Sequence, residues 1–204
     1  MPTSPVNTDT NIVSFSIKVD GKSIADTIEV TSLSVEIFSD GTSHAEITVR
    51  DGGKIDPFIV SNSKTFKIGS NVEVGLGYEN KTVQVFKGSI VSNDNSMDES
   101  HGLVLTIDCV AQTEMKPTSS DHTPKLKLTF GRDVLDFQLS QFKNDLEADK
   151  ASVEGFLLFQ GSSKADPNEA ILLQDFAQDY TGAHVIKRVH HLVSDGQWTT
   201  EVEI

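Results

Sequence analysis

Residues 11–19 read Asn-Ile-Val-Ser-Phe-Ser-Ile-Lys-Val, and this stretch sets the pattern for most of the chain. Successive side chains of a β-strand point to opposite faces of its sheet. Every second residue from Val13 to Val19 is apolar and falls on one face, whereas serines and Lys18 fall on the other. This period of two predicts a strand with one buried face.

The same alternation returns throughout the chain. In the first half it covers residues 33–37, 45–49, 72–76, 83–90 and 103–107. In the second half strand character is found at residues 126–130, 134–139, 153–159, 170–175, 183–193 and 197–204. Tight-turn residues separate the strands, among them Asp20-Gly21, Asp40-Gly41, Glu79-Asn80 and Ser194-Asp195-Gly196. The sequence therefore predicts a mainly β, antiparallel fold.

Two segments depart from this period. Gln141 to Ser152 is rich in helix-forming residues and predicts one short helix. Residues 115–124 are poor in apolar side chains and contain two prolines, as a connection between domains does. We therefore expect a flexible N-terminal tail at residues 1–10, a first β-barrel domain at 11–115, a linker at 116–124 and a second β-barrel domain at 125–204.

The two halves share a spacing of glycines. Each half has two glycines 14 residues apart, and an aromatic residue stands two positions before the first of them: Phe86, Gly88 and Gly102, then Tyr180, Gly182 and Gly196. Upstream, Gly69–Val74 matches Pro167–Ile171 in role, as a turn followed by a strand. This spacing favours an internal repeat of two related units. A meander with hairpins of similar length produces the same spacing by chance.

Composition excludes several classes of protein. The 204 residues contain 17 Lys and Arg against 30 Asp and Glu, and the net charge of −13 would repel nucleic-acid phosphates and anionic lipid heads. The longest apolar stretches, such as Phe156–Phe159, are far shorter than the roughly 20 residues of a membrane-spanning helix. The first residues lack the pattern of an export signal, and the single Cys109 permits no disulfide within the chain. We expect a protein made in a reducing cytoplasm.

Several motifs superficially suggest chemistry, but each has a simpler structural reading. Gly75–Tyr78 resembles a phosphate loop, yet no helix follows it, so we expect a strand or turn. The adjacent His190 and His191 point to opposite faces of a strand and cannot easily share a zinc ion with His184. The oxygen-rich run Asn93–Glu99 lacks the spacing of a calcium loop and predicts a solvated hairpin tip.

The remaining candidates are also structural. Cys109 lies in an alternating strand without a basic neighbour, which predicts a packed, unreactive thiol. The sequon Asn80–Thr82 predicts a turn, and the only tryptophan, Trp198, is expected in the core of the second domain, with an interface as the alternative. We therefore predict no catalytic, cofactor-binding or metal-binding residues and no enzyme activity.

Six blocks of the sequence resemble a known family when they are taken in order. They are Phe66–Tyr78, Val85–Ile90, Leu103–Cys109, Lys127–Leu135, Gly155–Ser162 and Val189–Thr200. The chain resembles the hub region of VgrG (Rhs element Vgr) spike proteins, which is related to the central hub of contractile phage tails. The blocks extend over most of residues 12–204, and their order is more specific than any one of them.

The resemblance implies two related β-barrels in each chain and three chains in a ring. Such a homotrimer adapts a sixfold inner tube to a threefold spike tip or needle in a type VI secretion or phage-tail-like machine. The implied partners are the inner tube protein, the tip or needle, and baseplate proteins. The particle would be assembled in the bacterial cytoplasm and delivered outward on contraction.

This sequence also departs from the family. The insertions between and within the barrels are short, and no needle follows Ile204. Either the chain is a reduced hub that receives its needle in trans, or segments of a longer protein are missing. The rival hypothesis is a monomeric β-sandwich module that binds carbohydrate or protein through its loops.

Overall fold

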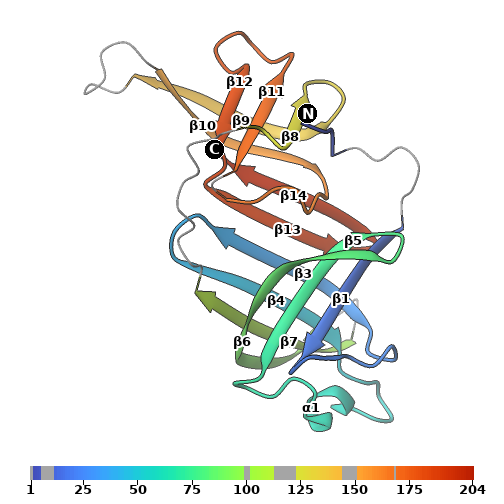
Figure 1. Cartoon of the computed structure of the whole chain (residues 1–204). Coiled ribbons are helices and arrows are strands. Elements are labelled where there is room, and N and C mark those ends of the chain that lie inside the picture. Colours follow the sequence, from blue (N-terminus) through green and yellow to red (C-terminus); the bar gives the residue numbers. More distant parts are fainter. Residues whose placement is uncertain (1, 6–11, 99–101, 113–122, 144–150, 168) are drawn as a thin grey trace.

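A computed structural model describes residues 2–5, 12–98, 102–112, 123–143, 151–167 and 169–204 (Figure 1). The elements of the first half are β1 (Val13–Val19), β2 (Lys22–Ser23), β3 (Val30–Phe38), β4 (Thr42–Arg50), α1 (Ile59–Ser63), β5 (Asn71–Tyr78), β6 (Lys81–Asp98) and β7 (Gly102–Gln112). Those of the second half are β8 (Leu126–Thr129), β9 (Val134–Lys143), β10 (Ala151–Gln160), β11 (Ala170–Gln174), β12 (Gly182–Val185), β13 (Arg188–Ser194) and β14 (Gln197–Glu203). The predicted mainly β, antiparallel fold is confirmed.

Most strands belong to one large sheet. Its 11 strands follow the order β2-β1-β5-β6-β7-β4-β3-β13-β14-β10-β9, and a second sheet of 3 strands has the order β12-β11-β8. Figure 1 shows the first half below and the second half above, with β3 and β13 side by side between them. The ladders of the described residues give an open order, and they do not show closure of either unit into a barrel.

The two halves repeat one strand order. In the first half the order is β1-β5-β6-β7-β4-β3, and in the second it is β8-β11, then β12 and β13, then β14-β10-β9. The long strand β6 thus corresponds to β12 and β13 together. One pairing differs, because β8 is parallel to β11 whereas β1 is antiparallel to β5. The internal repeat predicted from the glycine spacing is present in the topology.

Equivalent hydrogen bonds fix the correspondence residue by residue. The amide of Asp51 donates to the carbonyl of Leu103, and the amide of Gly161 donates to that of Trp198, both at 2.8 Å. The amide of Ile90 likewise donates to Ser70 and that of Ile186 to Glu169, both at 3.0 Å. These bonds make Gly88 the counterpart of His184. The glycine spacing therefore selected the right strands, but its register is two residues out of place at Gly88 and one residue out of place at Gly102.

The predicted helix is wrong in position. Gln141 and Phe142 lie in β9 and pair with Val153 and Ser152 of β10, and residues 144–150 lie outside the described residues. The short helix α1 lies instead in the first half. The buried carboxylate of Asp51 holds it by accepting hydrogen bonds from the amides of Val60 and Ser61.

Two further expectations are corrected. Asn93 to Asp98 continue β6 and pair with β7, so only the end of the predicted hairpin tip falls at residues 99–101, outside the described part. The predicted flexible tail is bound at Thr3, whose amide donates to Lys125 and whose carbonyl accepts from Lys127 beside β8. Residues 116–122 of the predicted linker also lie outside the described residues.

The hydrophobic interior forms two clusters. One lies in the first half and is built around Leu33, Ile47, Val74 and Ile107, and the other lies in the second half and is built around Leu128, Leu157, Phe159, Ile171 and Val202. Val193 and Trp198 are exceptions, because they lie on second-half strands and pack in the first cluster. The predicted place of Trp198 in the core of the second unit is therefore wrong, and the two units share side chains where they meet.

Candidate functional site

The junction of the two units combines a network of charged side chains, a buried histidine and an aromatic pair. We call it the seam and define it as the β3–β13 ladder together with Tyr78, Gly161 and Trp198. The ladder is antiparallel and runs from the pair Phe38–Arg188 to the pair Ser32–Ser194. It joins the two units in one continuous sheet through two strands that are far apart in sequence.

One face of the seam carries a network of charges around Arg188. Its Nη1 donates to Glu36 at 2.6 Å, its Nη2 to Glu201 at 2.7 Å and its Nε to Glu203 at 3.2 Å. Partial burial alone would lower the pKa of Arg188, but its hydrogen bonds to Glu36 and Glu203 raise it above the usual value. Glu36 comes from β3 and the other partners from β14, so the guanidinium ties the first unit to the second.

The other face of the seam is a packed core. Leu33, Val35 and His191 are fully buried, and Val193 is nearly so. Val193 stands opposite Leu33, and His191 stands opposite Val35. This side of the ladder therefore stabilises the junction by burying apolar side chains, as the interior of a domain does.

Three residues close the end of the seam. The rings of Tyr78 and Trp198 lie 5.2 Å apart between centroids, and the Tyr78 hydroxyl donates to the carbonyl of Gly161 at 3.2 Å. A Cβ on Gly161 would lie 2.0 Å from Cδ2 of Trp198. Only glycine fits against the indole there, because such a contact is far inside van der Waals distance.

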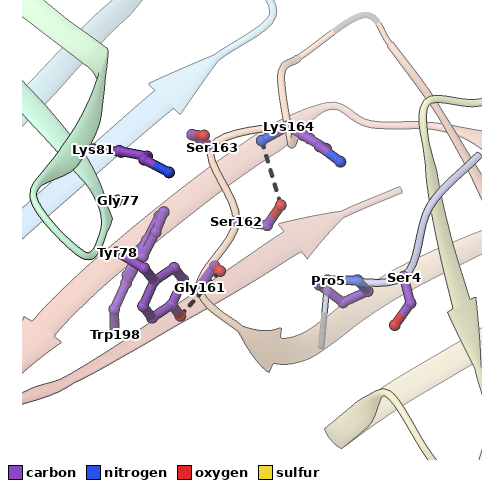
Figure 2. Close-up of a pocket in the computed structure, with 10 residues that line it drawn as sticks. All are labelled: Ser4, Pro5, Gly77, Tyr78, Lys81, Gly161, Ser162, Ser163, Lys164 and Trp198. Carbon is purple, nitrogen blue, oxygen red and sulfur yellow. Dashed lines mark hydrogen bonds between the residues drawn. The ribbon is translucent and has the colours of Figure 1, made fainter. Parts of the chain in front are cut away.

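A cleft of about 330 Å³ opens beside these residues (Figure 2). Its lining is Ser4, Pro5, Gly77, Tyr78, Lys81, Gly161, Ser162, Ser163, Lys164 and Trp198. The amine of Lys164 donates to the Thr3 hydroxyl at 2.7 Å, so the N-terminal segment forms one wall. The lining includes two lysines and one tyrosine but no carboxylate or histidine.

His191 is the one buried histidine among the described residues. Its Nδ1 lies 2.9 Å from the hydroxyl of Thr200, which also accepts the amide of Ser162 at 3.0 Å. Burial, with a smaller effect of His190, lowers the pKa of His191 to about 3. The ring is therefore neutral at neutral pH. Its neighbour His190 is half-buried on the other face and bonds to Ser34, as the alternation of a strand predicts.

Acid should weaken the fold through His191. The unfolded chain takes up a proton near pH 6.5, whereas the folded chain resists until about pH 3. The free energy of unfolding should fall as pH drops from 6.5, with a slope that approaches about 1.4 kcal/mol for each pH unit. Denaturant unfolding at several pH values checks this. His191→Gln should flatten the slope and the exposed control His44→Gln should not; equal slopes in all three proteins would contradict it.

The other candidates from the sequence are spread over the fold. Cys109 is buried in β7, and burial followed by the nearby Asp108 raises the pKa of its thiol to about 12. Gly75–Tyr78 belongs to β5, and the sequon begins in a turn where Glu79 and Asn80 both have positive φ. In the part of the chain that the structure describes, no three His, Cys, Asp or Glu side chains gather as metal ligands do.

Sequence reasoning missed two residues that hold the seam. In the sequence, nothing distinguishes Arg188 from other charged residues on strands. Its three acidic partners lie on two other strands, β3 and β14, and only the fold brings them together. Gly161 carried a weak signal, because a glycine two positions after the end of the predicted strand 153–159 indicates a close approach of another group. Nothing in the sequence indicated that the group was Trp198.

Two tail proteins of known structure share this fold. A tail protein of Neisseria meningitidis MC58 superimposes with a TM-score of 0.62 at 8% identity, over 94% of this chain and 96% of that chain. The 43 kDa tail protein of prophage MuSo2 from Shewanella oneidensis gives a TM-score of 0.59 at 9% identity, over 93% of this chain and 95% of that chain. At identities this low, the likeness shows a shared fold alone.

Residues 9–115 match the family described as Alg8 N-terminal domain. Because the match spans just over half of the chain, the chain belongs to that family. The description names no tail or spike protein, so it does not support the resemblance to VgrG. No curated protein matches the sequence. No helix in the described part of the chain has the length and apolar character needed to cross a bilayer.

Proposed function

We propose that this chain is a structural component of a contractile, phage-tail-like injection machine, such as a type VI secretion system. Three copies would form a ring that adapts a sixfold inner tube to a threefold spike tip. The fold shared with phage tail proteins supports the tail component, and the resemblance to the VgrG hub supports the ring. The role is mechanical, and we propose no enzyme activity.

The repeated topology is the observation that carries this proposal. Each chain contains two units of one strand order, so three chains present six similar units around an axis. A threefold object can then meet a sixfold one with related surfaces at every position. The seam is what such an adaptor needs, because it fixes the two units in one sheet and transmits force between them.

The proposed partners follow from this role. An inner tube protein would stack on one end of the ring, and a tip or needle, covalent or supplied in trans, would sit on the other, with baseplate proteins around them. Assembly would take place in the bacterial cytoplasm and delivery would be outward on contraction. Interfaces of this permanent kind bury roughly 2,000 Å² or more.

The mass of the protein in solution tests the ring. Sedimentation equilibrium over a range of micromolar concentrations should give three copies of the 22.2 kDa chain, about 67 kDa. A mass of 22.2 kDa at every concentration would contradict the adaptor and favour the rival, a monomeric β-sandwich that binds carbohydrate or protein. A stable dimer would contradict both.

A further inference from the structure

Among the described residues, one strand edge in each unit remains open: that of β9 in the second unit and that of the later part of β6 in the first. The outer edge of β9 is one end of the large sheet. On β6, β5 pairs only as far as Ser89, and Gly69 and Ser70 bond to Ile90. Beyond Ile90 no strand among the described residues pairs with that side of β6, whereas β7 occupies the other side.

The internal repeat indicates which strands would pair with these open edges. The ladders make β3 the counterpart of β9, because Val35–Ala45 in one hairpin corresponds to Leu139–Gly155 in the other. The hydrogen bonds of Ile90 and Ile186 make β13 the counterpart of the later part of β6. In the seam, β3 and β13 pair with each other. Their counterparts, β9 and the end of β6, have no such partner among the residues that the structure describes.

We propose that the outer edge of β9 pairs with the free edge of β6 in a second copy of this chain, in the register of the seam. This inference rests on the proposed ring and names its junction. In this register, Ser92 of one copy lies opposite Phe142 of the next copy and Asp98 lies opposite Asp136, and the two strands are antiparallel. Each copy then offers β9 to one neighbour and β6 to the other, which is a head-to-tail contact that can close a ring.

Exposed apolar side chains support this register. In the seam, Leu33 is 0% exposed and faces Val193, which is 8% exposed. Their counterparts are Phe137, which is 38% exposed, and Met97, which is 83% exposed. The same pair of positions is buried where the sheet continues and open to solvent where it ends. Pairing of two copies would place Met97 directly opposite Phe137 and bury both.

A second apolar group lies at the same junction. Phe137 belongs to an aromatic cluster with Phe130 and Phe176, whose ring centroids are 5.5 to 5.8 Å apart. Phe176 stands next to the residue of the second unit that corresponds to Tyr78. In the seam, Tyr78 contacts Gly161. The counterpart of Gly161 is Asp51, and the segment after it carries Ile55, which is 92% exposed. The next copy therefore has an apolar residue at the place where this cluster needs cover.

Unpaired strand edges also need a partner on general grounds. An open edge presents free amides and carbonyls and tends to recruit another strand. The described part of β9 is exposed along most of its length and carries Leu135, Phe137 and Phe142 as exposed apolar residues. A surface of this kind favours association, and a closed ring pairs each edge once.

A disulfide across the proposed ladder tests the register. In the seam, the amide of Ser39 donates to the carbonyl of Lys187 at 2.9 Å. Hydrogen-bonded and non-hydrogen-bonded pairs alternate along an antiparallel ladder, so the pair Ser34–Leu192, five positions further on, is not hydrogen-bonded. Side chains lie closest in pairs of this kind. Its counterpart is Ser96 of one copy and Gln138 of the next. Both residues are exposed, so cysteines there should leave the fold intact.

Oxidised Ser96→Cys/Gln138→Cys protein should run as covalent dimers and trimers on a non-reducing denaturing gel and as monomer after reduction. The matched control is Ser96→Cys/Leu135→Cys, because Leu135 is exposed and lies at the bulge of β9, three residues from the position opposite Ser96. It should stay monomeric, as should the wild-type chain with its buried Cys109. Circular dichroism confirms that each variant is folded.

The outcomes separate the junction from the ring. One outcome is that wild-type protein has the mass of a trimer but the Ser96→Cys/Gln138→Cys variant crosslinks no better than the control. This outcome would contradict the proposed junction without contradicting the proposed ring. Wild-type protein that stays monomeric would overturn both. Trimeric wild-type protein in which only the proposed pair crosslinks supports both.

Discussion

Trp198→Ala is expected to lower the free energy of unfolding by about 3–5 kcal/mol, the range for removing a large buried aromatic side chain. Trp198 is 4% exposed and contacts the rings of Tyr78 and His191. It packs in the first core although it belongs to a strand of the second unit. Its loss leaves a cavity where the two units meet. Chemical denaturation monitored by circular dichroism measures the change.

The matched control is Phe15→Ala, which removes an aromatic ring that is 40% exposed on β1. It should cost clearly less than Trp198→Ala, because less apolar surface returns to water. Equal losses for the two variants would show that Trp198 has no special place at the seam. Separate unfolding transitions in Trp198→Ala alone would indicate that this residue couples the two units.

Met97→Asp is expected to abolish self-association while the single chain stays folded. Met97 is 83% exposed in one copy, so a carboxylate there meets water. In the proposed ladder the same carboxylate would lie against Phe137 of the next copy without a partner, and burial of an unpaired charge is costly. Association should weaken by about 100-fold or more, which corresponds to roughly 2.7 kcal/mol.

Light scattering after size exclusion measures this effect as a fall from about 67 kDa to the 22.2 kDa of one chain. Val83→Asp is the control, because Val83 is 55% exposed on the same strand, in the part that β5 already pairs. It should leave the mass unchanged. If Met97→Asp and wild-type protein have the same mass, the β6 edge is not an interface.

The strands could be predicted because the pattern that indicates a strand lies within the strand itself. The period of two depends only on neighbouring residues, and it located Val13–Val19 and the other core strands. The expected helix failed because Gln141 and Phe142 form backbone pairs with β10, and tertiary pairing overrides weak local propensity. The run from Asn93 was misread for the same reason, since its polar residues extend β6 only because β7 lies beside them.

The seam could not be predicted from the pattern. Most strands of the described chain alternate in a similar way, and nothing local distinguishes β13, which pairs with β3 at least 150 residues away, from the other strands. The Arg188 network depends on the same long-range pairing. The glycine spacing did indicate a repeat, but hydrogen bonds were needed to set its register, and the open edges can be interpreted only with that register in hand.

Averaged electron micrographs of the assembled protein test most directly whether the junction between copies repeats the junction within each copy. The account predicts closed rings with six similar lobes from three chains, in which β9 of each copy continues into β6 of the next. Rings whose copies meet through other strands, or particles without closed rings, would contradict it.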